Sequence, residues 1–310
     1  MLTNTELKAI MDQSFAIPDG SSPQQLAPQL LANLGSPDSD RRETSLEIIW
    51  EWINNGCYTP TELKEMAGQL CANLQVGLGE QGDDRVFLRA FSALILGAVI
   101  RHEQHCAEAG KPFLTAEEVA GWREQSLACL LAERDLRGYV FEKGWAHALA
   151  HGADLLGDLA RSRHTDRAGL ESILNTVAAR VTCPAASVFL FEEDQRLATA
   201  VYTVLLRGEV EPSFFEAWLA GLLAPAGLPP WQESYSQPEL NHARVNTLAF
   251  LRALYFHILF GVRNFWQEPY YDREPQHQAE LLAGVQRAVR SFNRGRFYRE
   301  AAGAGLVASK

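Results

Sequence analysis

Apolar residues recur at spacings of three and four along almost the whole chain, and this helical period constrains the fold more than any other feature of the sequence. No segment longer than about five residues alternates apolar and polar residues as a half-buried β-strand does. Residues 186–191 have the aromatic and β-branched composition of a strand, but no second strand is available to pair with them, which favours a helix or a packed turn. We therefore predict an all-α protein.

Helix starts are marked repeatedly by a turn or capping residue followed closely by an acidic residue, as in Ser36-Pro37-Asp38 and Thr115-Ala116-Glu117-Glu118. Each long helix is preceded by a shorter helical stretch. The marks predict five long helices with starts near Arg41, Arg85, Lys143, Arg196 and Arg244.

The intervals between these starts, about 44 to 58 residues, are close to the roughly 40 to 47 residues of a helix pair in HEAT and armadillo repeats. A single helix pair cannot bury its apolar faces alone, so neighbouring pairs stack and leave a curved surface lined by the second helices. We therefore predict that residues 1–300 form one domain of HEAT/armadillo-like helix pairs arranged as an α-α superhelix. Residues 301–310 are small and weakly patterned, which predicts a flexible tail.

The charge and composition exclude several classes of protein. The net charge of −10, from 38 acidic and 28 basic residues, argues against a general nucleic-acid binder and against a protein that binds anionic membranes. Residues 1–13 lack the basic start and apolar run of a secretory signal, and the longest apolar run, 93–100, is too short to span a bilayer. Five widely spaced cysteines are typical of free thiols in a reducing compartment. These features predict a cytoplasmic protein.

Polar residues form stripes on the second helices when these are drawn at about 100° per residue. Between residues 144 and 161, His147, His151, Asp154 and Asp158 share an arc opposite the leucines, and residues 144–160 contain neither Lys nor Glu, which solvated helices favour. If the helices stack, the stripes line one concave wall. The stripes on the other long helices comprise Arg85, Arg89 and Ser92, then Arg196, Thr199 and Thr203, then His242, Asn246, Ala249, Ala253 and His257.

Residues 135–156, DLRGYVFEKGWAHALAHGADLL, resemble the signature of an uncharacterised bacterial family, domain of unknown function 2785. Residues 246–256, NTLAFLRALYF, are similar to its second recurring block. The resemblance implies HEAT-like helices and carries no established activity. The matching positions in the first segment are Arg137, Gly138, Tyr139, Gly144, Trp145, His147, His151, Gly152 and Asp154.

The polar wall predicts a non-catalytic module that binds a small ligand or a protein segment in a concave groove without a cofactor. In such a groove the arginines would pair with charges, the histidines and Asp154 would exchange hydrogen bonds, and Tyr139 and Trp145 would pack against the ligand. The candidate ligand-binding residues are Arg85, Arg89, Tyr139, Trp145, His147, His151, Asp154, Arg196 and Asn246.

Two alternatives use the same central stripe. The spacing His147-x3-His151-x2-Asp154 suits a divalent transition metal, and a metal-dependent hydrolase would use these ligands with Asp158 or another acid as proton acceptor. The zincin pattern His-Glu-x-x-His is absent, as are a phosphate loop, a Gly-x-Ser-x-Gly elbow and a Cys-x-x-Cys pair. In the other alternative, these side chains form hydrogen bonds that fix the packing of a buried polar layer.

Overall fold

The computed structural model describes residues 2–263 and 269–293, and nearly all of their regular structure is helical. The described strands form a two-stranded antiparallel hairpin, β1 (Tyr139–Val140) and β2 (Gly144–Trp145). The first helices are α1 (Asn4–Asp12), α2 (Pro23–Asn33), α3 (Ser39–Asn54), α4 (Pro60–Asn73), α5 (Arg85–Glu108) and α6 (Ala116–Ala132). The later helices are α7 (Ala148–Arg161), α8 (Arg167–Thr182), α9 (Glu193–Arg207), α10 (Pro212–Leu223), η1 (Trp231–Ser236), α11 (Pro238–Phe260), η2 (Pro269–Asp272) and α12 (Gln278–Asn293).

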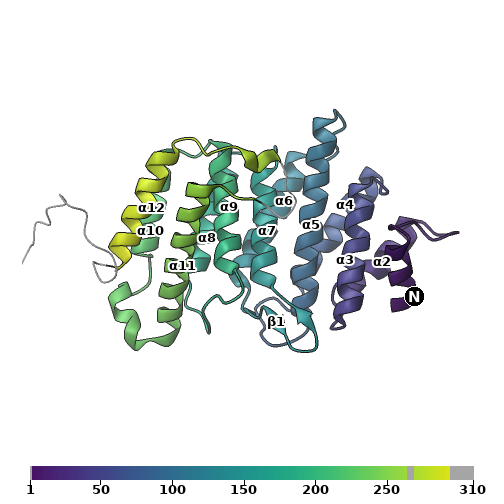
Figure 1. Cartoon of the computed structure of the whole chain (residues 1–310), viewed down its shortest axis with the longest axis horizontal. Coiled ribbons are helices and arrows are strands. Elements are labelled where there is room, and N and C mark those ends of the chain that lie inside the picture. The colour runs from purple at the N-terminus through teal and green to yellow at the C-terminus, as the bar shows by residue number, and fades with distance from the viewer. Residues whose placement is uncertain (1, 264–268, 294–310) are drawn as a thin grey trace, which may run out of the picture.

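The helices are stacked in chain order along the longest axis of the molecule, in two layers (Figure 1). Helices α3, α5, α7, α9 and α11 contact one another in sequence in one layer, and α4, α6, α8, α10 and α12 do so in the other. The first layer contains a helix near each of the five expected positions, but α7 and α9 are shorter than α6 and α8, which precede them, and α11 begins at Pro238 rather than near Arg244. The all-α prediction is confirmed, and the stack is compatible with HEAT-like pairs. The predicted tail, residues 301–310, lies outside the described residues.

The helix starts follow from local capping chemistry. At α6, the Thr115 hydroxyl accepts a hydrogen bond from the backbone N–H of Glu118, and the Glu118 carboxylate accepts one from the backbone N–H of Thr115. At α3, the carboxylate of Asp38 accepts a hydrogen bond from the backbone N–H of Arg41. Because these bonds satisfy N–H groups that have no partner inside the helix, the chain enters each helix at the position that the sequence marks.

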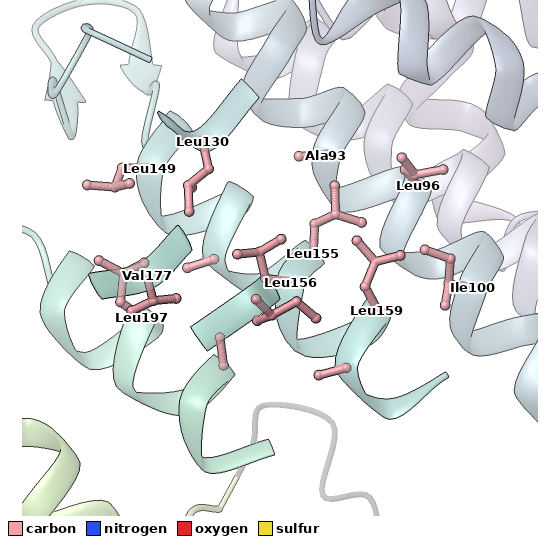
Figure 2. Packing of buried hydrophobic residues seen from close by; sticks show 14 of the residues in the cluster. Ala93, Leu96, Ile100, Leu130, Leu149, Leu155, Leu156, Leu159, Val177 and Leu197 are labelled. Atoms are coloured by element: carbon pink, nitrogen blue, oxygen red, sulfur yellow. The ribbon is translucent and has the colours of Figure 1, made fainter. Parts of the chain in front are cut away.

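The hydrophobic core lies between the two layers, and α7 is at its centre. Helix α7 packs against α5 and α9 within its own layer and against α6 and α8 in the other. Figure 2 shows its leucines meeting apolar side chains of all four neighbours. The labelled residues are Leu149, Leu155, Leu156 and Leu159 of α7, Ala93, Leu96 and Ile100 of α5, Leu130 of α6, Val177 of α8 and Leu197 of α9.

The central helix begins later than the sequence predicts. The pattern predicted a helix from residue 144, but residues 139–145 form the β1–β2 hairpin and α7 starts at Ala148. His147 is the N-cap of α7 and has a left-handed backbone, with φ of 56°. The turn needs glycine at 144, because φ there is 79° and a Cβ would lie 2.9 Å from Cβ of Ser39. The apolar period continued through the hairpin, and this concealed the turn.

The segment before α9 was expected to be a helix or a packed turn, and residues 183–192 have no regular secondary structure. The backbone N–H of Phe189 donates to Oδ1 of Asn246 in α11, at 2.8 Å. The segment is therefore held against α11 as a packed turn. Throughout the described ranges, every helix is too short or too polar to traverse a lipid bilayer.

Candidate functional site

A groove of roughly 1080 Å³ runs across the layer formed by α3, α5, α7, α9 and α11. A smaller hollow of roughly 550 Å³ adjoins it beside the β hairpin, and we call this hollow the hairpin pocket. The helices that line the groove are the second helices that the sequence predicted to line a common wall. The side chains that line both the groove and the hairpin pocket are Leu46, Glu47, Leu94, His151, Leu190, Glu192 and Arg196.

Arg42 holds the hairpin against α3. Its side chain is fully buried, and its guanidinium donates to the carbonyl oxygens of Ser36 and Lys143 at 2.7 Å and of Trp145 at 3.3 Å. The guanidinium also lies over the ring of Phe87, 4.1 Å from its centre. These contacts place carbonyl dipoles and an aromatic face around the buried cation, which also lies 3.7 Å from a carboxylate oxygen of Glu43. They therefore fix the position of the strand that carries Trp145.

An aromatic cluster forms the hairpin side of the pocket. The Trp145 ring stacks on the His147 ring with centres 5.0 Å apart, and the rings of Tyr139 and Phe191 meet Trp145 edge to face at 5.4 and 5.6 Å. Nε2 of His147 donates to the carbonyl oxygen of Phe191 at 2.5 Å, which ties the entry of α7 to the entry of α9. Tyr139 and Trp145 remain 54% and 41% exposed. The cluster is thus a rigid, partly exposed apolar surface.

His151 lies on the first turn of α7, at the boundary of the groove and the hairpin pocket. Its ring contacts the rings of His147 and Phe91, with centres 5.5 Å away in each case. Burial, together with the neighbouring His147, lowers the pKa of His151 to about 3, so the imidazole is neutral near pH 7. Nδ1 is buried and has no hydrogen-bond partner among the described residues.

Two arginine–aspartate pairs form the floor of the groove. Arg196 of α9 donates to both carboxylate oxygens of Asp154 at 2.8 and 2.9 Å, and Arg101 of α5 pairs with Asp158. Burial raises the pKa of Asp154 to about 6, against the opposing effect of Arg196, and burial also raises the pKa of Asp158. Each pair is close to neutral and links α7 to a neighbouring helix.

Glu47 of α3 and Glu192 at the start of α9 face the same groove and are exposed. Within residues 2–263 and 269–293, neither carboxylate has an ion-pair partner. Glu192 also has a left-handed backbone, with φ of 65°, which is uncommon for a residue with a side chain. The rim of the groove therefore carries negative charge that the described residues do not neutralise.

The structure brings together six of the predicted site residues and places three elsewhere. Arg89 is 2% exposed and pairs with Glu133, so it lies between the layers, and Arg85 pairs at the surface with Asp83. Asn246 is buried and holds the 183–192 segment. The residues brought together are Tyr139, Trp145, His147, His151, Asp154 and Arg196.

The orientation of α5 explains the displaced arginines. The sequence assigned the stripe of Arg85, Arg89 and Ser92 to the groove, but Arg89 points into the second layer, and the α5 side chains at the hairpin pocket are Leu94 and the otherwise buried Phe91. Helix α5 is buried on nearly every side, so its polar stripe does not indicate a solvent face. The sequence reasoning missed Arg101, although it follows Leu94 by two helical turns and therefore shares its face.

The metal alternative required His147, His151 and Asp154 to converge. In the described part of the chain, no group of three or more His, Cys, Asp or Glu side chains is arranged to hold a metal ion. His147 bonds to a backbone carbonyl, and Asp154 pairs with Arg196. The three side chains are neighbours along the groove without forming a common ligand set.

Residues 74–256 match the model of a family described as protein of unknown function (DUF2785). This match covers more than half of the chain. The chain belongs to this family. Neither a curated protein nor a solved structure matched the sequence. The matched region contains the hairpin, α7 and the start of α9, and so it includes most of the groove floor.

Proposed function

We propose that this member of the DUF2785 family is a cytoplasmic, non-catalytic binding module, and that its groove holds a protein segment. The observation that carries the proposal is the size and continuity of the hollow. The groove of roughly 1080 Å³ continues into the hairpin pocket of roughly 550 Å³, whereas small-molecule sites usually occupy about 300 to 1,000 Å³. An extended segment suits a long hollow lined by five successive helices.

The chemistry of the lining supports the same function. Leu190 is 69% exposed and Trp145 is 41% exposed, so both offer apolar surface to a partner. The floor pairs Asp154 with Arg196 and so offers hydrogen-bonding groups whose charges are already balanced. A surface of exposed apolar groups around satisfied polar groups is typical of recognition sites. The five free cysteines are in keeping with a reducing compartment.

The proposal is tested by selecting peptides from a random display library on the purified protein. Enriched peptides are then measured by calorimetry against the wild type, Leu190→Arg and Leu131→Arg. Leu190 lines the groove, whereas Leu131 is a similarly accessible leucine on α6 in the other layer, with 41% exposed. We expect the Leu190→Arg change to weaken binding at least about tenfold, or about 1.4 kcal/mol.

The Leu131→Arg variant should bind the selected peptides as the wild type does. Because Leu190 is largely exposed, its replacement should leave the thermal unfolding temperature close to that of the wild type. The proposal is contradicted if no peptide is enriched, or if every enriched peptide binds the two variants equally well.

A further inference from the structure

We infer that the segment held in the groove is basic, and that one of its lysine or arginine side chains enters the hairpin pocket. This inference rests on the proposed function and specifies the chemistry of the partner. It is carried by the negative charge that the described residues leave unbalanced in the groove and by the apolar walls of the pocket.

The lining of the groove and of the hairpin pocket carries more negative than positive charge. The pairs of Asp154 with Arg196 and of Asp158 with Arg101 cancel within the floor. Glu43 pairs with the buried Arg42 at 3.7 Å. The remaining acidic side chains in the linings belong to Glu47, Glu51, Glu192 and Asp194, and the remaining described arginine there is Arg263. A basic segment is therefore attracted, whereas phosphate-rich partners are repelled.

Two of these carboxylates line both hollows. Glu47 on α3 and Glu192 before α9 each line the hairpin pocket and the groove. Both are exposed, and neither is paired in the part of the chain that the structure describes. An ammonium or guanidinium that reaches either carboxylate would form a charge-assisted hydrogen bond to it.

The walls of the pocket suit the aliphatic stem of such a side chain. Leu94 and Leu190 offer methyl groups, and Trp145 offers an aromatic ring that also attracts a cation. Nδ1 of His151, which also lines the pocket, is buried and has no partner among the described residues. A long side chain with an apolar stem and several donors at its end meets all of these groups.

The experiment uses the peptides whose binding depends on Leu190. Each lysine is replaced by norleucine and each arginine by citrulline, and each peptide is measured against the wild type, against Glu47→Gln/Glu192→Gln and against the control Glu124→Gln. Glu124 is an exposed acid on α6, remote from the groove lining. Affinity is measured in about 50 mM and about 200 mM salt, since a charge-driven contact weakens with screening.

We expect these peptides to contain lysine or arginine, and replacement of one such residue to weaken binding at least about tenfold. The Glu47→Gln/Glu192→Gln variant should show a similar loss and a reduced salt dependence, whereas Glu124→Gln should bind as the wild type does.

This inference is overturned if peptides that depend on Leu190 contain no basic residues, or if the double variant binds them with unchanged affinity. Either result leaves the proposed function standing. If no peptide depends on Leu190, both fail. In that case, binding of agmatine that is lost in the double variant would instead identify a small organic cation as the ligand.

Discussion

Replacing Arg89 with methionine would leave the Glu133 carboxylate buried without its cation. Nε and Nη2 of Arg89 donate to the two oxygens of Glu133 at 2.8 and 3.0 Å, and Nη1 donates to the carbonyls of Val76 and Gly77. The two side chains are 2% and 3% exposed. Removing one partner of a buried pair costs about 3–5 kcal/mol, which corresponds to a fall of roughly 5–8 °C in Tm for a chain of this size.

Thermal and urea unfolding, followed by circular dichroism at 222 nm, measure this loss. Arg85→Met is the matched control, because Arg85 belongs to the same stripe in the sequence but is surface-exposed, so its variant should unfold close to the wild type. Adding Glu133→Gln to Arg89→Met should recover part of the lost stability, since the buried charge is then removed. The reasoning is refuted if Arg89→Met is as stable as the wild type, or if Arg85→Met loses as much.

The remaining predictions concern the hairpin pocket and its titrating groups. Gly138→Ala should destabilise the protein by about 1–3 kcal/mol in urea unfolding, because its Cβ would lie 2.1 Å from the Phe191 ring. Gly121→Ala is the control and should not destabilise the protein, because no atom lies within 4 Å of the added Cβ. Equal effects of the two changes would contradict this prediction. The pKa of His151 is lowered to about 3, so below pH 6.5 the unfolded state gains a proton at this residue and the folded state does not. The free energy of unfolding should therefore fall by about 2 kcal/mol between neutral pH and pH 5. This pH dependence should be lost in His151→Gln. Asp154, with its pKa raised to about 6, should act in the opposite sense: its contribution to the free energy of unfolding should increase as the pH falls from 7 towards 4. This increase should disappear in Asp154→Asn. If the free energy of unfolding changes equally between pH 7 and 5 in the wild type and the variants, both assignments are wrong.

Much of the architecture could be predicted because it depends on local interactions. Asp38 and Thr115 cap helices where the sequence marks a start, since capping bonds join residues three positions apart. The apolar period of α7 correctly assigned Leu155 and Leu159 to the core and His151 to the groove. One face of α7 is apolar and the opposite face is polar, so the spacing of its apolar residues predicts which side chains are buried.

The hairpin was missed because its position depends on a distant residue. Arg42 contacts the carbonyls of Lys143 and Trp145 about a hundred positions later in the chain, and no local pattern records such a contact. Glycine at position 144 was the available signal, because glycine adopts the left-handed backbone of a tight turn at little energetic cost. The period of three and four continued through residues 144–147 and favoured a helix instead.

The sequence by itself determined that the chain is helical, where most helices begin and which face of α7 is polar, because these properties arise from neighbours along the chain. Only the tertiary structure decided which polar stripes reach the groove. Arg89 faces the second layer because its buried counterion, Glu133, lies there. The two residues are 44 positions apart in the sequence. A buried charge must lie beside its counterion, and the fold alone brings such distant partners together.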